Sequence, residues 1–189
     1  MNPVVETIKN RRSIRRFQSE QIDRKALDII LESAIWAPSG HNTQPWHFLV
    51  IQDPDKIDRM SSRCIEKMAD SPIDWIRKIA AREGYHLFHK APTVVVVSSK
   101  KSDERDGLFY LADCSAAIQN MLLAAESLDI GTCWIGLTKF LFEDFGEVDS
   151  LNLPEGYLPF YTVAMGYKAA DFVAVPPPRK PGTVSWFGE

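Results

Sequence analysis

The sequence has few cysteines and no long apolar run. Only Cys64, Cys114 and Cys133 occur among its 189 residues, and no two of them form a C-x-x-C pair. This spacing excludes a disulfide framework and a zinc knuckle, and it predicts buried or free thiols in a reducing compartment. The longest aliphatic run, Val94 to Val97, is too short to span a bilayer, and residues 1–17 lack the apolar stretch of a signal peptide. We therefore expect a cytoplasmic protein that does not bind a membrane.

An excess of positive charge is missing as well. The chain carries 22 Lys and Arg against 25 Asp and Glu, a formal net charge of −3. This balance argues against a nucleic-acid partner or a polybasic membrane-binding surface. Local positive charge is nevertheless dense over residues 11–16, where four arginines occur, and such a local excess indicates an anionic small ligand.

Several catalytic motifs are absent. No G-x-S-x-G elbow, G-x-G-x-x-G stretch or P-loop occurs, so the sequence does not support a hydrolase triad, a Rossmann site or a nucleoside triphosphatase. His86 and His89 stand three residues apart, but no H-E-x-x-H pattern or cysteine partner accompanies them. No metal site is predicted.

The length and the 45% apolar content are those of one globular domain. We expect a single domain over residues 1–189 that ends in a Pro-rich arm over 173–189. Hydrophobic spacing and helix start and stop signals predict an alternation of elements. Asn2 before Pro3 and Asp23 are expected to start the first two helices, and Val4, Val5 and Ile8 to form the inner face of the first helix. Helices are expected over 3–10, 24–37 and 108–125, a mostly helical region over 54–90 with a break near 71–72, and strands over 46–52, 93–99, 131–137 and 157–167. This order predicts an α+β fold with a central mixed sheet and helices on both faces.

The first candidate binding motif is Arg-Arg-Ser-Ile-Arg-Arg-Phe over residues 11–17. Alternate side chains of an extended segment share one face, so Arg11, Ser13 and Arg15 are expected to point together, with Arg12 close by. Guanidinium groups match phosphate oxygens bidentately, and a serine hydroxyl adds a hydrogen bond. The alternative is a solvated charged turn.

Two further motifs contain glycine beside polar or aromatic residues. In Pro38 to Trp46, the side chains of Ser39, Asn42 and Gln44 offer the donors and acceptors that a heteroaromatic ring requires, although an ordinary turn favours the same residues. Residues 131–136 form a strand with glycine at both ends, a pattern that marks either a ligand near the backbone or plain turns.

The fourth motif is a run of prolines followed by Arg179 and Lys180. A stiff proline-rich arm that ends in two cations could deliver positive charge to a distant anion. The alternative is a flexible, solvated tail.

Taken together, these motifs resemble the nitroreductase family of FMN-dependent oxidoreductases. Residues 11–17 are similar to that family's R-R-S-x-R-x-F, and residues 38–48 to its P-S-x-x-N-x-Q-P-W-x-F. Residues 131–136 and 165–167, with the basic Pro-rich arm, resemble its later signatures. The likeness is weakest over 54–92. The chain departs from the pattern at Lys168, where a proline is common, and in the adjacent Arg179 and Lys180, which the family often separates.

The resemblance implies a role for each matching residue. The phosphate, the ribityl chain and the pyrimidine side of FMN would be held by Arg11, Arg12, Ser13 and Arg15. The flavin would be lined, in part from the partner subunit, by Pro38, Ser39, Gly40, Asn42 and Gln44. Ile135 and Gly136 would lie against the isoalloxazine, with a backbone N–H near N5. A further phosphate contact is assigned to Arg179 or Lys180.

The resemblance also implies a function. It implies a homodimer in which FMN passes a hydride from NAD(P)H to a nitro compound or quinone by a ping-pong mechanism, with no essential protein acid or base. It implies an arm that reaches the partner subunit. Three alternatives stay open: other chemistry on the same scaffold (dehalogenation, ene reduction or flavin fragmentation), a non-catalytic flavin-binding protein, and an interaction domain without a cofactor.

Overall fold

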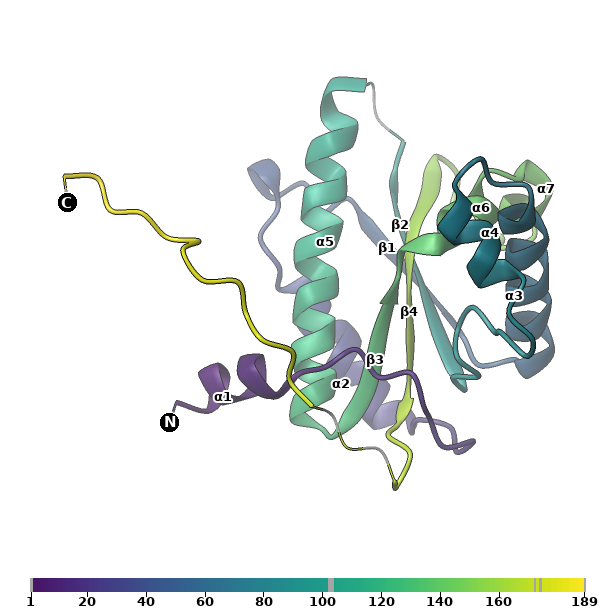
Figure 1. The fold of residues 1–189 in the computed structure, drawn as a ribbon. Helices are drawn as coiled ribbons and strands as arrows, with labels where there is room; N and C mark the ends of the chain where they lie inside the picture. The colour runs from purple at the N-terminus through teal and green to yellow at the C-terminus, as the bar shows by residue number, and fades with distance from the viewer. Residues whose placement is uncertain (1, 102–103, 172, 174, 189) are drawn as a thin grey trace.

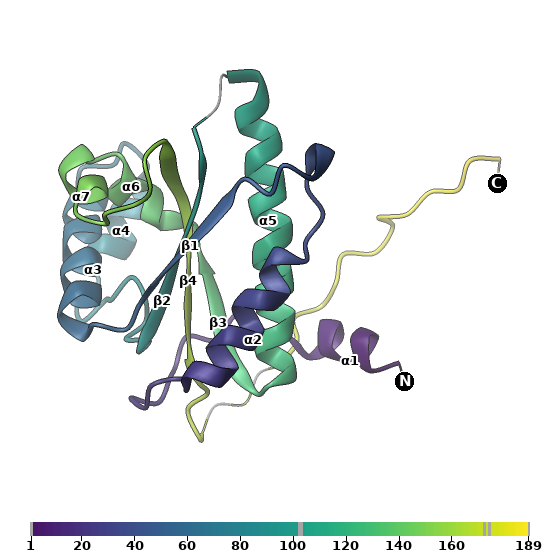
Figure 2. The ribbon, with the colours of Figure 1, turned by 180° about the vertical axis from the view of Figure 1, so that it is seen from behind.

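A four-stranded sheet stands between two groups of helices (Figures 1 and 2). The structure is a computed structural model, and it describes residues 2–101, 104–171, 173 and 175–188, with the backbone alone for 104–109. The strands are β1 (Trp46–Ile51), β2 (Thr93–Lys100), β3 (Ile130–Ile135) and β4 (Tyr157–Tyr167), in the order β1-β2-β4-β3. The predicted α+β class and the helices on both faces are confirmed.

All neighbouring strands in this sheet run antiparallel, whereas a mixed sheet was expected. The crossover from β2 through α5 (Glu104–Ser127) does make β3 parallel to β2. However, β4 inserts between β2 and β3 and pairs with both of them, so the two parallel strands never touch. The order of elements along the chain could not reveal this insertion, because it depends on where the last strand enters the sheet.

Each face of the sheet has its own core. One face packs against α2 (Arg24–Ile35) and α5, and its core includes Ile30, Ile118 and Val95. The other face packs against α3 (Pro54–Ala69), α4 (Asp74–Ala80), α6 (Lys139–Phe142) and α7 (Phe145–Asp149). β2 is buried on both sides, as its β-branched run predicts. The valines of β2 therefore join the two cores.

Local signals fixed most helix ends. The Asn2 side chain accepts a hydrogen bond from Val4 N, and the Asp23 side chain accepts one from Ala26 N. They cap α1 (Pro3–Asn10) and α2 as expected. The break near residue 71 separates α3 from α4, and the two short helices α6 and α7 were not predicted. The expectation that Val4, Val5 and Ile8 form an inner face of α1 is wrong, since α1 buries no residue in the single chain.

No helix in the described part of the chain combines the length and the apolar content that crossing a membrane requires. α5 extends further at both ends than the predicted 108–125, and the side chain of Leu108 at its predicted start lies outside the described residues. α5 matters for function because it runs the length of the sheet (Figure 1), and the loop around Gly40 and α1 contact it near its opposite ends.

Candidate functional site

The arginine-rich segment is joined to the edge of the sheet. Ser13 forms an isolated parallel bridge with Thr132 of β3, through a 2.8 Å hydrogen bond from Ile14 N to Thr132 O. Phe17 bridges Lys168, just after β4. Ile14 is buried against Gly131, so the close approach expected at this glycine is made by the chain's own segment and not by a ligand. These contacts fix the backbone from which the arginines project.

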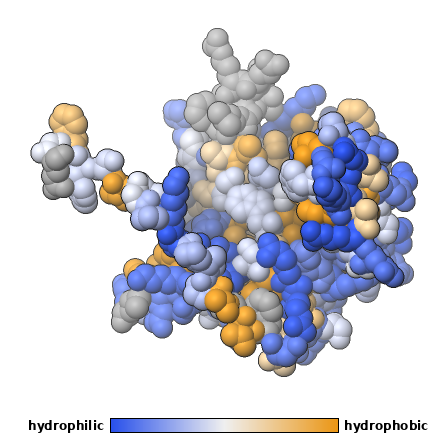
Figure 3. Space-filling model, viewed as in Figure 1, coloured by the Kyte–Doolittle hydropathy of each residue, from blue (hydrophilic) through white to orange (hydrophobic). Residues whose placement is uncertain are grey.

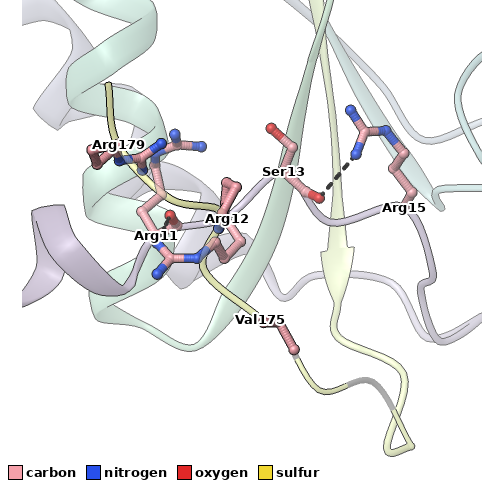
Figure 4. Close-up of a pocket in the computed structure, with 7 residues that line it drawn as sticks. Arg11, Arg12, Ser13, Arg15, Val175 and Arg179 are labelled. Carbon is pink, nitrogen blue, oxygen red and sulfur yellow. Dashed lines mark hydrogen bonds between the residues drawn. The ribbon is translucent and has the colours of Figure 1, made fainter. Parts of the chain in front are cut away.

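A pocket of about 430 Å³ opens beside this segment. In Figure 4 the side chains of Arg11, Arg12 and Arg179 gather on one side of Ser13, and that of Arg15 lies on the other side. The structure thus brings together four predicted residues from the start of the chain and one from its end. The complete lining is Arg11, Arg12, Ser13, Arg15, Val175, Pro177 and Arg179.

This pocket concentrates positive charge without a compensating carboxylate. Its lining holds four guanidinium groups and no acid, and none of the four forms an ion pair within the described residues. The neighbouring Arg16 differs, because it pairs with Asp171 at 2.6 Å. Like charges held together at a partly buried site repel one another, so an anion bound there would relieve that repulsion.

Arg12 has an unmet hydrogen-bonding requirement. Its Nη1 donates to the carbonyls of Lys9 and Arg11 at the end of α1, at 2.6 and 2.7 Å. Its Nε is buried and has no partner in the described structure. A buried N–H without an acceptor costs free energy, and a phosphate oxygen is an acceptor of the kind it lacks.

The C-terminal arm runs extended, and its end projects away from the body (Figure 3). Val175 and Arg179 reach the pocket, whereas the adjacent Lys180 is not part of its lining. Beyond Arg179 the arm exposes apolar side chains, including 71% of Trp186. Of the two candidate cations on the arm, only Arg179 therefore lines the pocket. The apolar tip of the arm is exposed to solvent in the single chain.

The Pro38–Gln44 loop lies elsewhere in the chain. It contains η1 (Gly40–Asn42) and is ordered by its own hydrogen bonds, from Gln44 N to Ser39 Oγ and from Gln44 Nε2 to Asn42 Oδ1, each 3.0 Å. Gly40 N donates to Asp113 near the start of α5, whereas α1 packs near Ser127 at its end. At 1.5 Å per residue these positions on α5 are about 20 Å apart. Within one chain, Pro38, Ser39, Gly40, Asn42 and Gln44 do not join the arginines.

A second pocket, of about 290 Å³, opens at the end of β3, where η2 (Gly136–Thr138) begins. β3 is an edge strand, and the predicted residues Ile135 and Gly136 lie in this pocket's lining. Arg15 lines both pockets, so it links the arginine cluster to β3. An elongated ligand with an anionic end could therefore extend from one pocket into the other past Arg15.

The other wall of the second pocket was missed by sequence reasoning. It is supplied by the end of α4 and the loop that follows, with the residues Ile79, Arg82, Tyr85, Leu87 and His89. These positions share no periodic pattern or motif that could have identified them. Burial, with help from Arg15 and His86, lowers the pKa of His89 to about 4. Burial also raises the pKa of the Tyr85 phenol and of the Cys133 thiol, so all three groups are uncharged at neutral pH.

His86 holds this loop in place. Its Nδ1 accepts hydrogen bonds from the backbone N–H groups of Phe88 and Lys90, each at 3.2 Å, and its Nε2 lies 3.0 Å from Asp58 Oδ1. An Nδ1 that accepts two hydrogen bonds carries no proton, so Nε2–H donates to Asp58. The contacts stabilise a turn in which His89 and Lys90 have φ of 55° and 57°, values that side chains disfavour.

Comparisons with known proteins agree with this geometry. The model of a family described as the nitroreductase family matches residues 8–167. A protein of Methanothermobacter thermautotrophicus, named provisionally as an NADH dehydrogenase/NAD(P)H nitroreductase, is 32% identical over 89% of this chain and 78% of its own length. FMN reductase (NADPH) of Bacillus subtilis is 28% identical over 89% of this chain and 67% of its own length.

A solved structure is also similar to this chain over its whole length. It is a nitroreductase with bound FMN from Bacteroides fragilis, 34% identical, with a TM-score of 0.89. The match covers 98% of this chain and 99% of the Bacteroides chain. The similarity therefore extends over nearly the whole chain, including the sheet and the helices on both of its faces.

Proposed function

The chain belongs to the nitroreductase family, and from that membership we propose that it uses FMN to pass an electron pair from NAD(P)H to a small electron-poor acceptor such as a nitro compound or a quinone. The observation that carries this proposal is the pocket where Arg11, Arg12 and Arg179 converge from the two ends of the chain. The named relatives supply the cofactor and the reductant: a nitroreductase with bound FMN and an NADPH-dependent FMN reductase.

The first pocket fits the phosphate end of FMN. A phosphate carries two negative charges and several acceptor oxygens, which suit a lining of four guanidiniums with no acid. It also offers an acceptor to the buried Nε of Arg12, which has none in the described structure. Arg11, Arg12, Ser13 and Arg179 would hold this phosphate, and Lys180 is left in a peripheral position.

The second pocket fits the ring end. Ile135 and Gly136 would lie against the isoalloxazine, and Arg15 would stabilise negative charge on its pyrimidine side. When bound, FMN supplies the two-electron chemistry, and the protein supplies position and electrostatics. The apolar wall of β3 excludes water from one side of the site, and the exposed rim leaves the other side accessible to donor and acceptor in turn. Such sharing of one site predicts ping-pong kinetics.

We further propose a homodimer in which the Pro38–Gln44 loop of one protomer completes the flavin site of its partner. The loop lies far from the arginines of its own chain. A groove of about 440 Å³ between α1, α2 and α5 exposes apolar side chains, among them 64% of Val4 and 79% of Trp36. Exposed apolar surface of this kind favours association, and the apolar tip of the arm is available to extend the contact.

Purification of the full chain tests the cofactor directly. A yellow protein whose released chromophore is FMN, and which oxidises NAD(P)H when a nitroarene or quinone is added, would support the proposal. Double-reciprocal plots at several acceptor concentrations should give parallel lines. A colourless protein that takes up no FMN would contradict it, and a yellow protein without turnover would favour a flavin-binding protein without catalysis.

A further inference from the structure

The wall of the second pocket opposite β3 has no role in the function proposed above. It consists of the end of α4 and the loop up to His89, and it faces the space that β3 and Arg15 line from the other side. Leu87 is buried and gives this wall an apolar base, while Arg82 stands exposed at its rim. The wall therefore combines an apolar surface with a cation at its edge.

Arg82 differs from the neighbouring cations in its side-chain contacts. Arg77 and Lys78, on α4, both pair with Asp74, at 3.3 and 2.6 Å. Arg82, one turn further along the chain, has neither an ion pair nor a side-chain hydrogen bond within the described residues. Its charge is thus available to a ligand in the pocket.

The rest of the pocket offers nothing negative. Among the described residues no carboxylate lines it, and His89, Tyr85 and Cys133 are uncharged at neutral pH for the reasons given above. Arg15 and Arg82 are therefore the only charged groups of the lining in the part of the chain that the structure describes. With Arg15 directed to the flavin, Arg82 is left for a second anion, and the Tyr85 hydroxyl can add a neutral donor.

We propose that Arg82 makes this enzyme selective for aromatic acceptors that carry an anionic group, such as a carboxylate. Arg82 would pair with that group at the rim, Tyr85 would donate to it, and the apolar side chains of Ile79 and Leu87 would contact the aromatic ring. A guanidinium suits a carboxylate because it can donate two parallel hydrogen bonds. The inference rests on the proposed function, in which FMN occupies the β3 side of the same pocket.

Binding of non-reducible probes to the FMN-loaded protein tests the selectivity without turnover. Benzoate and benzyl alcohol have the same ring and differ in charge, and each can be followed by the change it causes in the absorption of bound FMN. Wild type should bind benzoate about tenfold more tightly than benzyl alcohol, as a charge-assisted hydrogen bond allows. Arg82→Gln should bind the two equally, and Arg82→Lys should recover part of the preference.

Lys78→Gln is the matched control, because it removes a neighbouring cation that is already paired with Asp74. It should leave the benzoate preference intact. Equal binding of benzoate and benzyl alcohol by wild type would overturn the proposal. An unchanged preference in Arg82→Gln would also overturn it.

Turnover separates this inference from the proposed function. Reduction of 4-nitrobenzyl alcohol by wild type tests the function itself. For 4-nitrobenzoate, Arg82→Gln should raise KM about tenfold with little change in kcat, and KM for 4-nitrobenzyl alcohol should stay constant. A selective rise in KM for NADPH over NADH would assign Arg82 to the reductant's phosphate, and a tenfold loss of FMN affinity would assign it to the cofactor. Either result would overturn the inference while leaving the proposed function standing.

Discussion

Gly131 lies directly beneath the side chain of Ile14. A Cβ placed on Gly131 would stand 2.8 Å from Ile14 Cγ2, closer than side-chain atoms approach one another. Ile14 is buried and separates Ser13 from Arg15, two residues that line the first pocket. The glycine therefore sets how closely the arginine segment can pack on β3.

Gly131→Ala should destabilise the protein and weaken FMN binding together. The methyl group forces Ile14 outward, and overpacking of this kind costs about 1–3 kcal/mol. The measurements are urea unfolding and titration of the FMN-free protein with FMN. Gly146→Ala in α7, where the nearest atom is 3.4 Å from the added Cβ, is the control and should leave FMN affinity unchanged. Normal FMN affinity in Gly131→Ala would show that the segment's packing does not set the pocket.

Arg11→Ala should weaken FMN retention about tenfold to a hundredfold, because a charge-assisted phosphate contact contributes about 1.5–3 kcal/mol. Fluorescence titration with FMN measures the dissociation constant. Arg24→Ala removes an exposed arginine of α2 that pairs with Asp28, and it serves as the control. An unchanged dissociation constant in Arg11→Ala would remove this residue from the site.

Two substitutions can separate the contributions of the two ring nitrogens of His86 to stability. Asn keeps an acceptor near the position of Nδ1, whereas Gln keeps a donor near that of Nε2. His86→Gln leaves the N–H groups of Phe88 and Lys90 without their acceptor, and should lower the free energy of unfolding by about 1–3 kcal/mol. His86→Asn should lose less. An equal loss in both variants, measured by urea unfolding at pH 7, would contradict this division.

Stability should fall as the pH is lowered from about 6.5 towards 4. Burial lowers the pKa of His86 and His89 in the folded protein, to about 4 for His89, from the usual histidine value of 6.5. The unfolded chain then binds more protons in this interval, so protonation favours unfolding, and the contribution is fully present only above pH 6.5. Unfolding free energies measured across this range should depend less on pH in His89→Gln. An equal slope in His89→Gln and wild type would contradict this assignment.

Trp36→Glu should weaken the proposed dimer and the binding of FMN with it. The substitution places a charge in the apolar groove between α1, α2 and α5, where burial of an unpaired carboxylate is costly. Sedimentation equilibrium gives the dimer dissociation constant. Phe145→Glu is the control, because Phe145 is 84% exposed on α7, on the other side of the sheet. A Trp36→Glu protein that stays dimeric would exclude this groove from the interface.

The parts of the fold that sequence predicts are those determined locally. The caps at Asn2 and Asp23, the buried valines of β2 and the break near Ser71 depend on residues within one or two turns of each other. The antiparallel sheet could not be predicted, because it depends on β4 entering between two strands made earlier in the chain. The exposure of α1 could not be predicted for a similar reason. Apolar spacing identifies the face of a helix that tends to be buried, but it does not identify the surface against which that face packs.

The candidate site divides in the same way. Arginines and glycines in recognisable motifs marked the first pocket and the end of β3, and Arg179 was placed among the candidates because it follows a run of prolines. Arg82, Tyr85 and His89 were missed because they line the second pocket through a turn that His86 and Asp58 hold. The spacing of Arg82, Tyr85 and His89 in the sequence does not predict that turn. Gly131 was identified as a site of close approach, but the sequence could not show that Ile14 makes it.

The pocket shared by Arg11 and Arg179 also bears on how the protein is made. The ribosome releases Arg11 long before Arg179, because 167 residues separate them in the sequence. A nascent chain that has already formed its sheet still lacks the wall of the first pocket that Val175, Pro177 and Arg179 supply. Loading of the cofactor is therefore expected to follow the synthesis of Arg179, and a chain truncated before Arg179 should fold its core yet hold FMN weakly.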